Sequence, residues 1–201
     1  MRIYLLEGTK EYLRYARFSH PGTWAPGILC KECGQSTQKL TEPLLVEWEP
    51  DSDFIADFSW CSYVALITQE VAEKLLDAGF EILLGSVDFV KPAQKRARKA
   101  RVAYPYSGPP LFWMMPTEMV SVDEEGSNIR LDIDCKECGQ KRYTFRREGL
   151  AIDSKNWNSP KIFRVAQYTR SRAMFVSEQG RDIILRHGFT NVRFSEAGII
   201  S

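Results

Sequence analysis

Cys30-Lys31-Glu32-Cys33-Gly34 recurs letter for letter as Cys135-Lys136-Glu137-Cys138-Gly139, and these two pentapeptides contain four of the five cysteines in the chain. Two cysteines separated by two residues can direct both sulfurs to one point, and the glycine that follows accepts the left-handed backbone that aims N–H groups at the thiolates. Each pentapeptide is therefore typical of a zinc knuckle. Two knuckles supply a tetrahedral shell, so the sequence predicts one structural Zn²⁺ bound by Cys30, Cys33, Cys135 and Cys138.

Two segments with the signals of a short helix also recur. The first follows Thr68, a good N-cap, and ends at Gly79, and the second follows Ser177 and ends at Gly188. The apolar residues that we expect to face the core are Val71, Ala72, Leu75 and Leu76 in the first helix, and Ile184 and Leu185 in the second.

The order and spacing of these landmarks predict a two-fold internal repeat. The two knuckles are offset by 105 residues and the two helix caps by 109. We expect an α+β fold in a single domain, 1–201, with two related lobes of about 1–109 and 110–201. Each lobe is expected to contain a zinc knuckle in a β-hairpin and a strand-helix-strand unit, and a shared zinc-ribbon-like site joins the lobes. The expected strands include 2–6, 44–48, 80–84, 87–90, 129–134 and 141–147.

The repeat also accounts for the long distance between the knuckles. They are separated by 101 residues, whereas a compact four-cysteine zinc site has a gap of roughly 15 to 20 residues. Lobes that pack with pseudo-symmetry would bring equivalent knuckles together. Three alternatives stay open: two separate half-sites, iron in a rubredoxin-like site, and a redox-active cysteine pair.

Composition places the chain among ordinary globular proteins. It is 44% hydrophobic and 26% charged with a formal net charge of +1, which gives no overall attraction to nucleic acid or to an acidic membrane. The first residues reach charged side chains too early for a signal peptide, and no stretch approaches the roughly 20 apolar residues of a membrane span. We expect a cytoplasmic protein, where paired cysteines favour metal over disulfides.

The segment 91–101 is the most basic part of the chain, with six basic residues and no acid. It is either a solvated connector or a surface for an acidic partner, and the candidate partner-binding residues are Lys95, Arg96, Arg98, Lys99 and Arg101. Tyr104 and Tyr106 follow it, and basic residues beside aromatic ones can hold single-stranded nucleic acid. The low net charge and the acids within the knuckles argue against a nucleic-acid partner.

The sequence offers little for catalysis. His20 and His187 are the only histidines, there is no phosphate-binding glycine-rich loop, and a four-cysteine zinc has no open position for water. We therefore do not expect an enzyme. Cys61 has no partner at ligand spacing and is expected to be a small buried residue.

Taken together, the doubled Cys-Lys-Glu-Cys-Gly and the matching helix ends at 78–80 and 187–189 resemble the double-CXXCG motif family, found as multiple paralogues in myxobacteria. Members of that family include immunity proteins paired with swarm-inhibition toxins. The resemblance implies a cytoplasmic protein that binds and neutralises a cognate protein toxin. It carries over only the four knuckle cysteines, as metal ligands, and assigns no toxin-binding residue. The alternative function is a zinc-ribbon nucleic-acid-binding or regulatory module.

Overall fold

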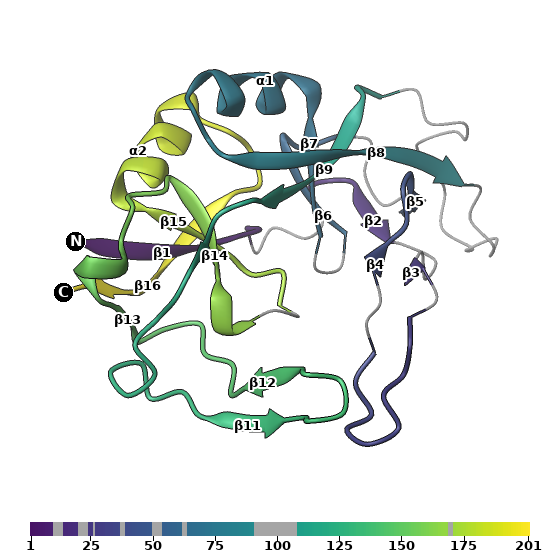
Figure 1. The fold of residues 1–201 in the computed structure, drawn as a ribbon. Helices are drawn as coiled ribbons and strands as arrows, with labels where there is room; N and C mark the ends of the chain where they lie inside the picture. Colours follow the sequence, from purple (N-terminus) through teal and green to yellow (C-terminus); the bar gives the residue numbers. More distant parts are fainter. Residues whose placement is uncertain are drawn as a thin grey trace.

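A computed structural model of the protein describes residues 1–9, 14–19, 24–25, 27–36, 39–49, 54–61, 64–90, 108–168 and 171–201. Within these ranges the chain forms two α-helices, two short 3₁₀-helices and sixteen β-strands (Figure 1). The predicted α+β class is confirmed. No described helix is long and apolar enough to cross a membrane.

Six strands close into a barrel. In order around it they are β2 (Arg17–Ser19), β5 (Leu44–Glu49), β8 (Ile82–Val90), β9 (Leu111–Pro116), β7 (Val64–Thr68) and β6 (Phe58–Cys61). Each strand turns alternate side chains inward, and the enclosed cluster includes Phe18, Leu44, Leu66 and Trp113. Cys61 is also fully buried in this cluster, as expected for a small apolar side chain.

A second, open sheet contains six strands. In order they are β10 (Met119–Val120), β14 (Ile162–Val165), β15 (Met174–Ser177), β1 (Arg2–Glu7), β16 (Arg193–Ile200) and β13 (Leu150–Ile152). One face of this sheet carries its own buried cluster, which includes Ile3, Leu5, Phe163 and Phe175. The 3₁₀-helices η1 (Ser154–Asn156) and η2 (Ala166–Tyr168) lie in the connections beside it.

The two sheets have the same order and direction of strands. In the barrel, β9 is antiparallel to β7 and to β8, and β5 is parallel to β8. In the open sheet, β1 is antiparallel to β15 and to β16, and β13 is parallel to β16. The outer pairs also correspond, since β2 is parallel to β6 and β10 is parallel to β14. Only the barrel is closed, by the pairing of β2 with β5.

One strand of each sheet comes from the far part of the chain. β1, at the N-terminus, lies between two C-terminal strands of the open sheet, and β9, which follows residue 110, lies between β7 and β8 of the barrel. The sheets therefore do not coincide with the predicted lobes 1–109 and 110–201, because each sheet contains a strand from the other lobe.

Two helices form where the cap and stop signals predicted them. α1 spans Gln69–Asp77 after Thr68, whose hydroxyl accepts a hydrogen bond from the backbone N–H of Val71. α2 spans Glu178–His187 and ends at Gly188, which has a left-handed φ of 65°. Figure 1 shows both helices on the same side of the molecule.

The apolar faces of the helices differ from the prediction at two positions. Leu76 is 48% exposed and Leu185 is 56% exposed, whereas Ile183 and Ile184 are buried. The expected pairing of Ile184 with Leu185 is wrong because the face of α2 that contacts the sheet also includes Gly180, and this sets the rotation of the helix.

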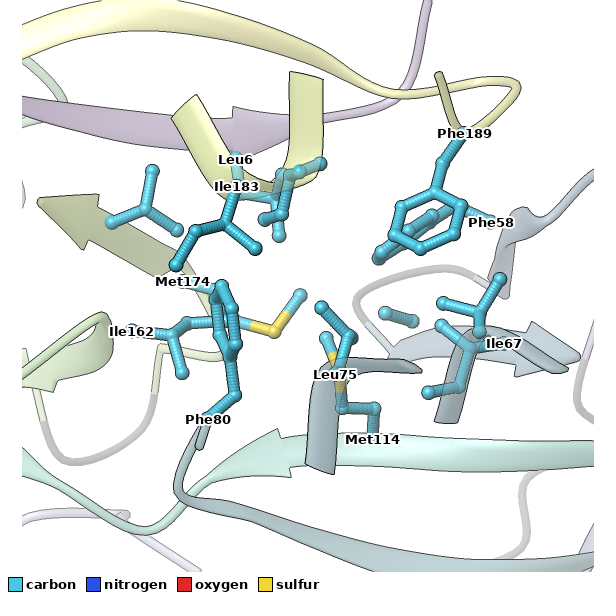
Figure 2. Close-up of a cluster of buried hydrophobic side chains, with 14 of the residues drawn as sticks. Leu6, Phe58, Ile67, Leu75, Phe80, Met114, Ile162, Met174, Ile183 and Phe189 are labelled. Carbon is cyan, nitrogen blue, oxygen red and sulfur yellow. The ribbon is translucent and has the colours of Figure 1, made fainter. Parts of the chain in front are cut away.

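The main core joins both sheets and both helices. Figure 2 shows Leu6, Met174 and Ile162 of the open sheet packed with Leu75 of α1, Ile183 of α2 and Met114 of the barrel, and Phe58 and Phe189 lie at one side. Their rings are 5.8 Å apart between centroids. Because this core contains residues from both sheets, the two parts of the fold stabilise each other through burial of apolar surface.

Candidate metal centre

The two knuckles have the same backbone geometry. In the first, the N–H of Cys30 donates to the carbonyl oxygen of Gln35 at 2.8 Å, and the N–H of Gly34 donates to the carbonyl oxygen of Cys30 at 2.9 Å. The corresponding bonds of the second knuckle are 3.0 and 2.8 Å. Gly34 and Gly139 have φ values of 66° and 68°. A side chain would be strained in this left-handed conformation, which explains the glycine at this position in both copies.

The repeated sequence extends one residue beyond the pentapeptide. Gln35 and Gln140 follow the two glycines, and their carbonyl oxygens accept the hydrogen bonds from Cys30 and Cys135. Sequence reasoning that considers only the cysteines and glycines does not identify these two glutamines. The signal that could have found them is that the repeat is identical at a sixth position. These bonds close the turn that presents both sulfurs on one side.

Each knuckle lies at the end of a two-stranded antiparallel segment. β3 (Trp24–Ala25) and β4 (Lys39–Leu40) flank the first, and β11 (Leu131–Asp134) and β12 (Lys141–Tyr143) flank the second. The second hairpin confirms the strands expected on both sides of its cysteines, in shorter form. In Figure 1 the two knuckle loops lie side by side below the sheets.

The four sulfurs form one cluster. The Sγ atoms of Cys30 and Cys135 are 3.7 Å apart, as are those of Cys33 and Cys138. All four Sγ atoms lie within 4.8 Å of one another. Zn–S bonds of about 2.3 Å in a tetrahedron place neighbouring sulfurs about 3.8 Å apart. The cluster therefore fits one tetrahedrally bound metal ion, and the two knuckles are not separate half-sites on opposite faces.

The cluster is half enclosed by the protein. Cys30 and Cys135 are buried, Cys33 is half-buried and Cys138 is exposed, and all four are free thiols. The pair deeper in the protein and the pair nearer the solvent each contain one cysteine from each knuckle. A metal ion bound here would therefore be held equally by two segments that are 105 residues apart.

The environment separates the pKa values of the thiols. Hydrogen bonding from the backbone N–H of Cys33 lowers the pKa of Cys30 to about 7, against the effect of burial. The backbone N–H of Gln140 lowers the pKa of Cys138, but burial and the hydrogen bonds with the other three thiols outweigh it and raise this pKa to about 12. Four thiolates so close together repel one another, so a bound cation is what allows all four to be ionised.

Of the two histidines, only His187 lies in the described part of the chain, and it is not part of the cysteine cluster. His187 is exposed at the end of α2, and its ring stacks on Phe189 with centroids 5.1 Å apart. His20 and the whole basic segment 91–101, with Lys95, Arg96, Arg98, Lys99 and Arg101, lie outside the described residues. The partner-binding role of that segment stays a prediction.

Two comparisons with known proteins assign no family or function to the cysteine cluster. No protein-family model matches the chain, and no curated protein matches it.

Proposed function

We propose that Cys30, Cys33, Cys135 and Cys138 hold one structural Zn²⁺ that clamps the two knuckles together. The observation that carries this proposal is the single cluster of four sulfurs from segments 105 residues apart. A four-thiolate zinc has no open coordination position, so its contribution is cross-linking and not activation of water. Structural zinc contributes apparent free energies of about 10 to 16 kcal/mol in small zinc peptides.

The clamp belongs, in this proposal, to a protein built from an internal duplication. The equal strand order of the barrel and the open sheet supports the predicted repeat, as do the two capped helices and the two knuckles. A duplicated unit with pseudo-two-fold symmetry places equivalent elements around one axis. The knuckles then meet because they are equivalent, and one metal ion serves both.

We further propose that the protein is a cytoplasmic immunity protein that binds a cognate protein toxin and blocks its active site. Support comes from the resemblance of the doubled motif to the double-CXXCG family. Its mechanism is stoichiometric binding by a pre-formed surface, for which a fold fixed by a shared core and a metal clamp is well suited because little conformational entropy is lost on binding.

Elemental analysis of purified protein tests the metal proposal. We expect one zinc per chain, loss of that zinc in Cys135→Ser, and an unchanged zinc content in the matched control Cys61→Ala, whose thiol is buried in the barrel away from the cluster. Iron in place of zinc would give visible absorption. Zinc at two per chain, or retained after Cys135→Ser, would contradict a shared four-cysteine site.

The immunity role is tested by searching the neighbouring genes for a large toxin and by assaying the protein against any toxin found there. Co-expression should restore the growth of cells that produce the toxin, and the purified proteins should form an equimolar complex. Toxicity that persists when the immunity protein is present in excess, without formation of a complex, contradicts the role.

A zinc-ribbon nucleic-acid-binding module is the second candidate, and the exposed two-stranded hairpin beside the cysteine cluster is the observation that favours it. It predicts binding to DNA or RNA that weakens steeply as salt is raised. Removal of positive charge at Lys95, Arg96, Arg98 and Lys99 should then reduce both the affinity and its salt dependence.

A further inference from the structure

A cleft with a volume of about 640 Å³ lies where the end of β1 meets β2 and the segments that lead into β15 and β16. Its described lining contains four arginines and one acidic residue: Arg17, Arg147, Arg172, Arg193 and Glu7. We call it the arginine cleft. The whole chain has a net charge of only +1, so this concentration of positive charge is local. A cleft lined by one sign of charge focuses the field and favours an oppositely charged ligand.

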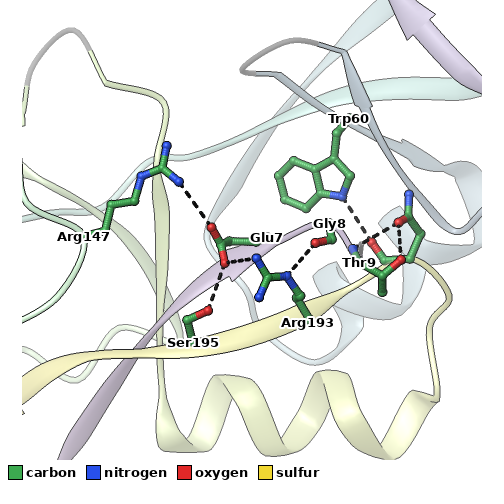
Figure 3. Close-up of polar contacts among 8 residues, drawn as sticks. Glu7, Gly8, Thr9, Trp60, Arg147, Arg193 and Ser195 are labelled. Carbon is green, nitrogen blue, oxygen red and sulfur yellow. Dashed lines mark hydrogen bonds and ion pairs between the residues drawn. The ribbon is translucent and has the colours of Figure 1, made fainter. Parts of the chain in front are cut away.

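Glu7 is engaged mainly with one of the four arginines. Its carboxylate is 2.8 Å from Arg193, and the hydroxyl of Ser195 donates to Glu7 at 2.9 Å. Arg193 also donates from Nε to the carbonyl oxygen of Gly8 at 2.8 Å (Figure 3). Arg147 is 3.5 Å from Glu7, and its side chain is 64% exposed. Arg193 is thus a fixed part of the wall, whereas Arg147 can turn its guanidinium toward a ligand.

The floor of the cleft is rigid. The side chain of Asn191 accepts hydrogen bonds from the N–H and hydroxyl of Thr9 at 3.2 and 3.0 Å and donates to the carbonyl oxygen of Phe58 at 2.8 Å. The indole N–H of Trp60 donates to the carbonyl oxygen of Asn191 at 3.1 Å. A Cβ at Gly8 would be 2.6 Å from the Trp60 ring, so only glycine fits there. Side chains held in this way form a pre-organised binding site.

Arg172 lies in a surrounding that favours an anion. Burial and the positive charge of Arg164 both lower the pKa of its guanidinium. An anion placed in the cleft would favour the charged form of this guanidinium, as any nearby opposite charge does.

The aromatic side chains of the cleft lining favour a carboxylate over single-stranded nucleic acid as the bound anion. Phe145 packs on Tyr168 with centroids 4.9 Å apart and also lies under the guanidinium of Arg147. Tyr15 packs on Phe54 at 5.5 Å, and Trp60 stacks on Phe58 at 6.5 Å. Single-stranded nucleic acid is held by bases that stack on aromatic rings, and these rings already pack within the protein. The guanidinium fork, in contrast, matches a carboxylate directly.

We propose that the arginine cleft binds an acidic segment of the partner protein, with its carboxylates held by the guanidinium groups of Arg147 and Arg172. This inference rests on the proposed function, since the partner is the toxin that the protein neutralises. The cleft volume lies within the range of roughly 300 to 1,000 Å³ found for specific binding pockets, which is enough for a few side chains of an extended segment.

A fluorescent hexaglutamate peptide tests the proposal through its anisotropy on addition of the zinc-loaded protein. We expect binding that weakens with salt and a loss of about tenfold in affinity for Arg147→Glu. The matched control is Arg2→Glu at the other end of β1. Arg2 is 60% exposed and 3.4 Å from Glu196, so it has nearly the same exposure and the same kind of ion pair. Binding by this control should change less than twofold.

The following outcomes would overturn the proposal: no binding of the peptide to the unmodified protein at low salt, an equal loss for Arg2→Glu, or tighter and Arg147-dependent binding of a single-stranded oligonucleotide. The thermal transition of each variant shows that it is folded. Complex formation between the toxin and Arg147→Glu separates this inference from the immunity role. If Arg147→Glu still forms the complex, the cleft is not the binding site but the immunity role is retained. If the unmodified protein forms no complex with the toxin, the immunity role itself is wrong.

Discussion

Gly180 lies in the first turn of α2, where an added Cβ would collide with the backbone carbonyl of Lys161. Helix propensity favours alanine over glycine by about 1 kcal/mol, but overpacking against a backbone atom costs about 1 to 3 kcal/mol. We expect the net effect of Gly180→Ala to lower the free energy of unfolding by about 1 kcal/mol, measured by denaturant titration of the zinc-loaded protein.

Gln179 provides the matched control, because it is exposed in the same turn of α2. Gln179→Ala should change the free energy of unfolding by less than about 0.5 kcal/mol. A Gly180→Ala protein that is more stable than the unmodified protein would show that α2 can move away from Lys161, and that local propensity and not packing decides this position.

Single residues are predictable from sequence where the signal is local. Thr68, Ser177 and Gly188 act as helix caps because their own chemistry satisfies the ends of a helix, and the knuckle glycines adopt the conformation that their turns require. Leu185 is different, because its exposure depends on the rotation of α2 against the sheet. That rotation is fixed by the contact of Gly180 with Lys161, to which no local signal in the sequence points.

Among the elements, we expect the hairpin β11–β12 to depend most on the proposed zinc. Its strand residues are exposed or half-buried, so it buries little apolar surface of its own, and a two-stranded hairpin alone is marginally stable in water. Removal of zinc with a chelator should raise hydrogen exchange in residues 27–36 and 131–143 by about tenfold or more. Exchange in α1 and α2, whose apolar faces are in the main core, should change little.

Mass spectrometry of hydrogen exchange measures this difference within one sample, with the two helices as internal controls. The same pattern should appear in Cys135→Ser without a chelator. A uniform rise over the whole chain would mean that zinc holds the entire fold together, and no rise in either knuckle would mean that the ion is not a clamp.

Elements with a strong local signal can be located from sequence, but their pairing cannot. β1, α1 and α2 form where periodicity and caps predicted them, and the expected strands 80–84 and 87–90 form one strand, β8. The position of β1 between β15 and β16 brings together residues more than 160 positions apart, and no local pattern encodes such a contact. The arginine cleft has the same origin, because its four arginines come from distant parts of the chain that only the tertiary fold assembles.

At the scale of the whole molecule, three links join the parts of the chain before and after the connection from β8 to β9. β1 completes the open sheet, β9 completes the barrel, and the cysteine cluster takes two sulfurs from each part. The main core is a fourth contribution, since it contains side chains from both parts. Neither part can complete its sheet alone, because the barrel then lacks β9 and the open sheet lacks β1.

We therefore expect a chain cut between Val90 and Leu111 to reassemble from its two pieces. Co-expressed pieces should co-purify through a tag on either one, with one zinc per pair, because the cut breaks no described strand or helix. Each piece expressed alone should be insoluble or lack a cooperative thermal transition, since a sheet that lacks β9 or β1 exposes both apolar surface and unpaired backbone groups. Introducing Cys135→Ser into the second piece should weaken the association of the two pieces without abolishing it. The contacts of β1 in the open sheet, of β9 in the barrel and of the main core remain. A piece that folds cooperatively alone would show that the strand contributed by the other piece is not required for stability. The molecule would then be two independent units held together by the metal and the core contacts.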